Sequence, residues 1–94
     1  MFGQKMLEDE VPIAWKAVPR HVAVLAADGT EIGTAESILG DEEEDIFHGL
    51  ALRRAADGQT VEVPARRVKK MTQQHIVTDL TADEVQNLPA YRRR

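Results

Sequence analysis

The chain has 94 residues, of which 43% are hydrophobic and 30% charged, and its 16 acidic side chains outnumber the 12 basic ones to give a formal charge of −4. This length accommodates one small domain with a thin core, and the apolar fraction is too high for a disordered polymer. The lack of cysteine excludes disulfide frameworks, thiolate metal sites and cysteine nucleophiles, and a pI of about 5.3 argues against a dedicated duplex-DNA binder. The longest apolar run, Val22 to Ala27, is too short for a membrane span, so we expect a cytoplasmic protein.

Residues 1–19 are predicted to form an N-terminal arm. Pro12 and Pro19 disfavour a long helix in it, because proline lacks a donor and restricts the residue before it. Trp15, the single tryptophan, lies within this arm. We expect Trp15 to pack the arm onto its own domain; the alternative is a contact with a neighbouring chain, where a buried tryptophan contributes strongly to binding.

Residues 20–79 are predicted to form the main domain, built from short strands. A first strand with apolar residues at alternate positions ends at an Asp28-Gly29 turn, and a second runs from Glu31 or Ile32 to about Leu39. A polar loop over residues 40–45 follows, with five consecutive carboxylates. The segment Ile46 to Arg53 then reads as a central strand.

The turn sequence Ala-Ala-Asp-Gly of residues 26–29 recurs at residues 55–58, which predicts two hairpins with the same turn chemistry. A strand over residues 60–64 follows the second copy. Ala65, Val68 and Met71 are three residues apart, a spacing that predicts a single helical turn, and a last strand is expected from His75 to Asp79.

Residues 80–94 are predicted to form a C-terminal helix and a basic tail, Arg92 to Arg94. Thr81 and Glu84 have the spacing of a capping box. Leu80 and Val85 have the spacing of a hydrophobic staple, and a proline ends the helix at position 89. The sequence therefore predicts a mainly β fold of five to six short strands with one short helix.

The order of these segments resembles the PRC-barrel family. The resemblance covers roughly residues 20–79, and it depends on Asp28-Gly29-Thr30-Glu31-Ile32-Gly33, then Ile38-Leu39, Gly49-Leu50-Ala51-Leu52 and Val61-Glu62-Val63-Pro64. The ending Leu88-Pro89-Ala90-Tyr91 is similar to that of stand-alone bacterial members. The family includes the cytoplasmic domain of the photosynthetic reaction-centre H subunit and the C-terminal domain of the ribosome maturation factor. The resemblance implies a small β-barrel with a protein-contacting role, and we expect neither the transmembrane helix of the first relative nor the preceding RNA-side domain of the second.

Catalytic, metal and cofactor sites are not expected. His21, His48 and His75 stand apart from one another and from any nucleophile motif. We expect His48 to be partly buried and the other two histidines to contact solvent at strand starts. The run Asp41 to Asp45 lacks the alternating ligands and central glycine of a calcium loop, and the glycines are explained by turns and close packing.

Charge is distributed unevenly along the sequence. Residues 28–45 carry eight acidic side chains and no basic one, whereas residues 53–70 carry six basic and two acidic. Either these patches attract within one molecule, or they meet between copies and favour a homodimer or docking to a charged protein. The alternative is a role in RNA metabolism or ribosome assembly, with the basic side chains contacting phosphates. The candidate interaction residues are Trp15, Arg53, Arg54, Arg66, Arg67, Lys69 and Lys70.

Overall fold

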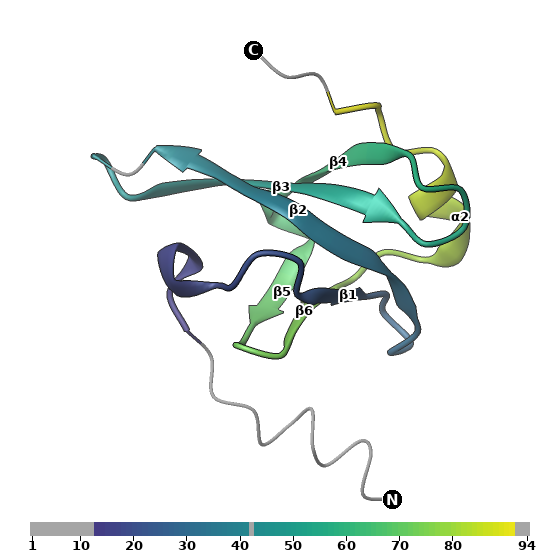
Figure 1. Ribbon diagram of the computed structural model, residues 1–94, viewed down its shortest axis with the longest axis horizontal. Coiled ribbons are helices and arrows are strands. Elements are labelled where there is room, and N and C mark those ends of the chain that lie inside the picture. Colours follow the sequence, from purple (N-terminus) through teal and green to yellow (C-terminus); the bar gives the residue numbers. More distant parts are fainter. Residues whose placement is uncertain (1–12, 42, 92–94) are drawn as a thin grey trace, which may run out of the picture.

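The computed structural model describes residues 13–41 and 43–91, and within them the protein is mainly β (Figure 1). Two 3₁₀ turns and one short α-helix accompany six strands. The elements in chain order are η1 (Trp15–Ala17), β1 (Ala23–Leu25), β2 (Glu31–Asp41), β3 (Ile46–Arg54), β4 (Thr60–Pro64), η2 (Ala65–Arg67), β5 (Val68–Met71), β6 (His75–Thr78) and α2 (Ala82–Gln86).

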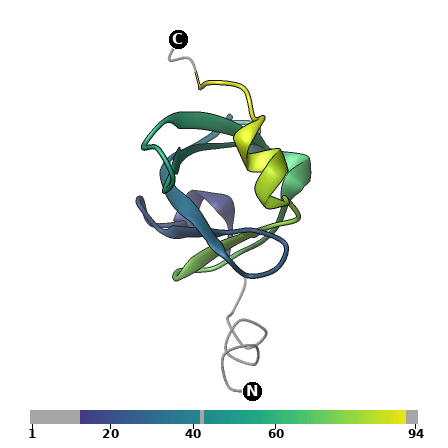
Figure 2. The same cartoon turned by 90° about the vertical axis from the view of Figure 1, so that its right-hand side faces the viewer.

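The six strands form one mixed sheet in the order β4-β3-β2-β1-β6-β5. Neighbouring strands are antiparallel except for β1 and β6, which are parallel. The sheet is strongly curved, and its strands surround the core when the molecule is viewed from the end that carries α2 (Figure 2). The two edge strands, β4 and β5, are consecutive in the chain and joined through η2.

The core consists of aliphatic side chains from the strands, from the segments that precede β1 and α2, and from α2 itself. Burying such side chains is the main favourable term in folding a domain of this size. Two buried threonines accompany them, and the Thr78 hydroxyl donates a hydrogen bond to the Leu25 carbonyl at 2.8 Å. The largest fully buried aliphatic side chains are Val24, Leu50, Leu52, Val63, Ile76 and Leu80.

The predicted strands are present, with two differences. β2 continues to Asp41, past the expected end near Leu39. The predicted helical turn after Pro64 is η2 alone, because Val68–Met71 is a strand that pairs with β6. The three-residue spacing of apolar positions suggested a helix over these residues. A β-bulge between Val68 and Lys70 breaks the alternation of apolar and polar side chains by which an edge strand is recognised.

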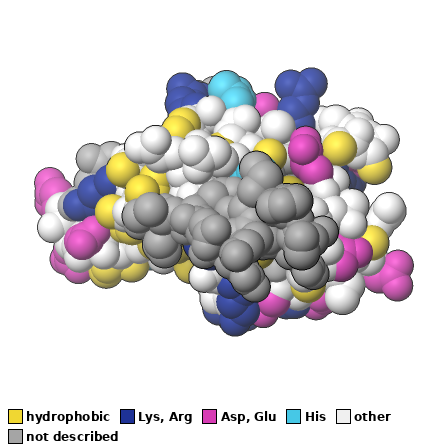
Figure 3. Space-filling model, turned by 90° about the horizontal axis from the view of Figure 1, so that it is seen from below, with side chains coloured by type: hydrophobic (Ala, Val, Ile, Leu, Met, Phe, Trp, Pro, Cys, Tyr) yellow, Lys and Arg dark blue, Asp and Glu magenta, His cyan; other side chains and the backbone are white. Residues whose placement is uncertain are grey.

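The prediction of a partly buried His48 is wrong, because this side chain is exposed. The paired strands β2 and β3 extend beyond the core as a two-stranded projection, and the buried part of β3 begins only at Gly49. This projection forms the left end of the molecule in Figure 1. At the same end, Figure 3 shows acidic, basic and hydrophobic side chains close together. His21 is exposed and precedes β1, and the half-buried His75 begins β6, as predicted.

Both edge strands form hydrogen bonds with segments nearer the chain ends. Beside β4, Glu62 N–H donates to the Pro89 carbonyl at 2.9 Å and Tyr91 N–H donates to the Thr60 carbonyl at 3.0 Å. Beside β5, Ile13 N–H donates to the Met71 carbonyl at 2.9 Å. These bonds satisfy some of the backbone groups that an edge strand exposes.

The described part of the predicted arm, residues 13–19, contacts the sheet. Residues 1–12 of the predicted arm, Glu42 and the tail Arg92 to Arg94 lie outside the described residues. No helix within residues 13–41 and 43–91 has the length and apolar character needed to cross a membrane.

Candidate functional site

Helix α2 begins with the predicted capping box. The Thr81 hydroxyl accepts a hydrogen bond from Glu84 N–H at 3.2 Å, and the Glu84 carboxylate accepts one from Thr81 N–H at 2.9 Å. Leu80 and Val85, the predicted staple, are both buried. A five-residue helix is unstable alone, so these contacts and the packing beneath it hold α2 in place.

The two Ala-Ala-Asp-Gly turns have the same local chemistry, as the repeat predicted. Asp28 Oδ1 accepts a hydrogen bond from Thr30 N–H, and Asp57 Oδ1 accepts one from Gln59 N–H, both at 3.0 Å. The glycine that follows each aspartate has a positive φ, 88° at Gly29 and 73° at Gly58. These backbone bonds are the main cause of the lowered pKa of both aspartates, and Arg54 lowers the pKa of Asp57 further.

Arg54 joins the second of these turns to the C-terminal end of α2. Its Nε and Nη2 donate to the two carboxylate oxygens of Asp57, at 3.1 and 2.7 Å. Its Nη1 donates to the carbonyl oxygens of Val85 and Gln86, each at 3.2 Å. The side chain is 15% exposed, so this guanidinium is committed to fixing the helix end.

Arg67 holds the other end of α2. It pairs with Asp79 just after β6, and its Nη2 lies 2.7 Å from Glu84 Oε2 in the first turn of the helix. The bond to Arg67 is the main cause of the lowered pKa of Asp79, whereas the pKa of Glu84 is lowered first by Thr81 N–H and then by Arg67. Lys69 Nζ also lies 3.4 Å from Asp79.

The six basic candidates therefore do not form one patch. Arg54 and Arg67 fix the two ends of α2, and Arg53 makes a long contact of 3.7 Å with Glu36. Arg66 is exposed in η2, and Lys70 is half-buried in β5. Arg53 contacts the acidic segment 28–45 through Glu36, whereas Arg54, Arg67 and Lys69 pair with Asp57, Asp79 and Glu84, which lie outside that segment. These ion pairs are therefore within one molecule, but most of them do not join the two charged segments.

Trp15 packs against its own domain. Its Nε1–H donates to Asp45 Oδ1 at 3.1 Å, and its ring centroid is 6.0 Å from that of Phe47. A Cβ at Gly40 would lie 2.8 Å from the indole, so glycine permits this close approach. Lys16 Nζ, which pairs with Asp45, lies 5.7 Å from the indole centroid. Trp15 therefore links the arm to the β2–β3 projection.

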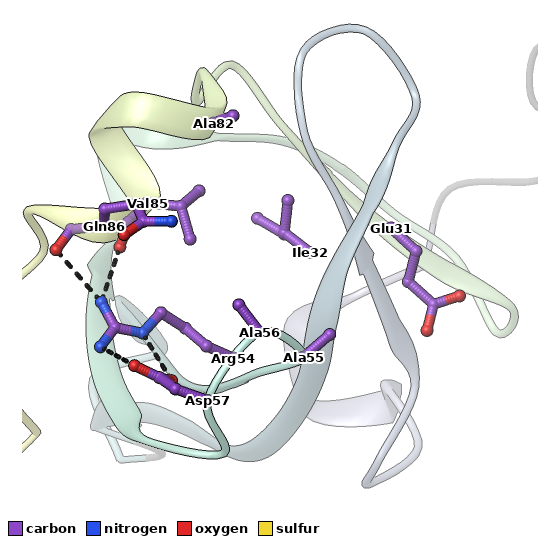
Figure 4. Close-up of a pocket in the computed structure, with 9 residues that line it drawn as sticks. All are labelled: Glu31, Ile32, Arg54, Ala55, Ala56, Asp57, Ala82, Val85 and Gln86. Atoms are coloured by element: carbon purple, nitrogen blue, oxygen red, sulfur yellow. Dashed lines mark hydrogen bonds and ion pairs between the residues drawn. The ribbon is translucent and has the colours of Figure 1, made fainter.

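A cleft of about 360 Å³ opens between α2, the start of β2 and the turn after β3 (Figure 4). Ile32, Ala56 and Val85 point toward its centre, whereas Glu31 points away from it. Arg54 and Asp57 are bonded to each other along one side, so the cleft presents mainly apolar surface. It is lined by Glu31, Ile32, Arg54, Ala55, Ala56, Asp57, Ala82, Val85 and Gln86.

The residues that line this cleft are better suited to binding an apolar group than to making or breaking covalent bonds. Its titratable side chains are Glu31, Arg54 and Asp57, and the last two neutralise each other. Among the described residues, no three histidine, cysteine or acidic side chains are arranged to hold a metal ion. The chemistry available in the cleft is burial of an apolar group.

No protein-family model matches the sequence. Sequence reasoning identified Arg54 as an interaction residue but missed the apolar cleft residues Ile32, Ala55, Ala56 and Ala82. The sequence signal for this cleft was the repeated Ala-Ala-Asp-Gly turn. The two alanines before the aspartate are small and leave space beside α2.

Proposed function

We propose that the protein is a non-enzymatic interaction module of the PRC-barrel type that self-associates and that receives an apolar side chain of a partner protein in the cleft beside α2. The observation that carries this proposal is an apolar cleft whose polar neighbours, Arg54 and Asp57, are already bonded to each other and to α2. An occupant therefore gains mainly from burying apolar surface, at about 25 cal/mol per Å².

The barrel assignment is supported by the curvature of the sheet and by its order. The edge strands β4 and β5 are joined by only three residues, Ala65–Arg67, and would form the seam of the barrel. Helix α2 lies at one end of this curved sheet (Figure 2). In this arrangement the sheet is the scaffold, and the cleft is formed by loops and a helix at its end, as in many binding proteins.

The size of the cleft favours a side chain over a large ligand. A volume of about 360 Å³ is near the lower limit of pockets that bind small molecules, roughly 300–1,000 Å³. An aliphatic or aromatic side chain anchored in such a pocket, surrounded by weaker contacts, is the usual pattern of a protein-binding hot spot. We therefore expect the partner to present a single apolar anchor.

RNA binding has less support. Arg54 and Arg67, two of the basic residues considered for phosphate contacts, bond to Asp57, Asp79, Glu84 and helix carbonyl groups. Releasing them for phosphate would detach α2. Of the remaining basic candidates, Arg53 is on β3, apart from Arg66, Lys69 and Lys70 on the consecutive elements η2 and β5.

The experiment is affinity capture from the native host with a wild-type bait and an Ala82→Phe bait, in lysates with and without nuclease. Ala82 is exposed at the rim of the cleft, so the phenyl ring obstructs the cleft without altering the core. We expect nuclease-resistant protein partners that the Ala82→Phe bait loses.

The matched control is Gln73→Phe, which adds the same ring at an exposed turn between β5 and β6. This bait is expected to retain the partners. Capture that disappears with nuclease and is unaffected by Ala82→Phe would contradict the proposal and support the RNA alternative.

A further inference from the structure

The tip of the β2–β3 projection is acidic and carries an apolar residue. We define the acidic tip as residues 41 and 43–46. Asp41 Oδ1 accepts hydrogen bonds from Glu43 N–H at 3.0 Å and Glu44 N–H at 3.3 Å, which fixes the turn, and these residues are exposed. Ile46 is 43% exposed and is the large hydrophobic side chain exposed in the described part of the chain.

Contacts with η1 hold the acidic tip in position. Asp45 is bound by Trp15 Nε1–H and by Lys16, and the indole packs on Phe47 at the base of the tip. A braced projection loses little conformational freedom when it binds, so it is suited to insert into another surface.

A second groove, of about 510 Å³, has the opposite charge. We call it the lysine groove. It lies along β5 and η2, with an apolar floor and two lysines on its lining. The Lys69 side chain remains 58% exposed despite its contact with Asp79, and the exposed Arg66 is adjacent in sequence to the groove residue Ala65. The lining comprises Ile13, Phe47, Ala65, Val68, Lys69, Lys70 and Met71.

The acidic tip and the lysine groove are neighbours on the molecule. Phe47 lines the groove and directly follows Ile46 of the tip. When a projection lies beside its complementary groove, a two-fold axis can place each projection in the groove of the other copy and close the assembly at two subunits. Burial of Ile46 and the approach of Glu43 and Glu44 to the lysines would stabilise both halves of such an interface.

We propose that the protein forms a reciprocal homodimer in which the acidic tip of each copy occupies the lysine groove of the other. This inference rests on the self-association in the proposed function and names the surfaces that produce it. The occupant of the lysine groove is then a second copy of this chain, because the acidic tip and the groove of one molecule have complementary charge.

The test is charge reversal with complementation, followed by sedimentation equilibrium at low ionic strength. A tip variant carries Glu43→Lys and Glu44→Lys, and a groove variant carries Lys69→Glu and Lys70→Glu. Each alone brings like charges together across the interface and is expected to weaken dimerisation about 100-fold. An equimolar mixture pairs each reversed surface with an opposite charge and is expected to restore the dimer.

Thermal unfolding of each variant shows that it is folded, and Glu62→Lys provides a charge-reversal control at a half-buried position on β4, outside the cleft, the acidic tip and the lysine groove. This control is expected to dimerise like the wild type. Dimers that persist in both reversed variants would overturn the tip-to-groove interface while leaving self-association intact. A wild-type protein that stays monomeric at every concentration would overturn self-association itself.

Discussion

Glu84 is bound by Arg67 through one carboxylate oxygen and by the backbone N–H of Thr81 through the other, at 2.7 and 2.9 Å. One side chain thus completes the capping box of α2 and an ion pair that extends through Arg67 to Asp79 after β6. The position of the helix, and with it the width of the cleft, depends on this shared carboxylate.

Lowering the pH is expected to weaken the bonds that the carboxylates of Glu84 and Asp79 make around α2. The pKa values of Glu84 and Asp79 are lowered in the folded protein, by Thr81 N–H and Arg67 for the first and by Arg67 for the second. Their contribution to stability is complete above the unfolded-state pKa values of about 4 and is lost as the pH falls through the lowered folded-state values. Thermal unfolding measured from about pH 7 to about pH 2 should show this loss below about pH 4.

The matched variant is Arg67→Gln, which removes the charge that lowers both pKa values. It is expected to be less stable than the wild type at neutral pH and less sensitive to acid. An unchanged dependence of the melting temperature on pH would contradict the role given to Arg67.

Removing the cap should loosen α2 specifically. Thr81→Ala deletes the hydroxyl that accepts Glu84 N–H, and such a loss costs about 1 kcal/mol. Urea unfolding measures this cost, and hydrogen exchange of the Glu84 amide localises it. Thr81→Ser keeps the acceptor and is expected to behave like the wild type; equal losses in both variants would argue against capping.

The contribution of Arg54 to stability should depend on the geometry of its guanidinium group and not on its charge alone. Arg54→Lys keeps the charge but cannot bond Asp57 with two nitrogens while also reaching the carbonyls of Val85 and Gln86. We expect a loss of about 2 kcal/mol in the free energy of unfolding, with faster amide exchange in α2. Arg53→Lys, on the neighbouring exposed side chain, is the control and should change stability little.

Gly49 and Gly58 distinguish lack of space from backbone strain. Both have positive φ values, 140° and 73°, but a Cβ at Gly49 would overlap the Val63 carbonyl oxygen, whereas one at Gly58 meets nothing within 4 Å. Gly58→Ala should cost about 1–2 kcal/mol from strain alone. Gly49→Ala should cost more, because β4 must also move away, and circular dichroism during thermal unfolding compares the two. Equal costs would contradict the close pairing of β3 and β4 at this point.

Local chemistry made much of the fold predictable from the sequence. Asp-Gly turns and the Thr81 capping box depend on residues a few positions apart, so their signals survive in the sequence alone. β5 was missed because an edge strand with the sequence Val-Lys-Lys-Met lacks apolar alternation. The exposure of His48 was mispredicted because it depends on how far the core extends along β3, which is a tertiary property.

The candidate site was predictable only in part, for the same reason. The sequence shows which basic residues are present, but it does not show their partners, because these come from distant positions. Arg54 meets α2 more than 30 residues away, and Arg67 meets Asp79 and Glu84 across β5 and β6. The sequence pattern indicated a charged surface, whereas folding converts two of its arginines into supports for the cleft.

The most direct test of the cleft as a protein-docking site is photo-crosslinking in the native host from benzoylphenylalanine placed at Gln86, which lines the cleft and is exposed. The same photoreactive residue at Gln73, in the β5–β6 turn, is the reference. Docking of a protein at the cleft is expected to give a discrete, nuclease-resistant protein adduct from position 86 that position 73 does not give. Identical adducts from both positions, or an adduct to RNA from position 86, would contradict it.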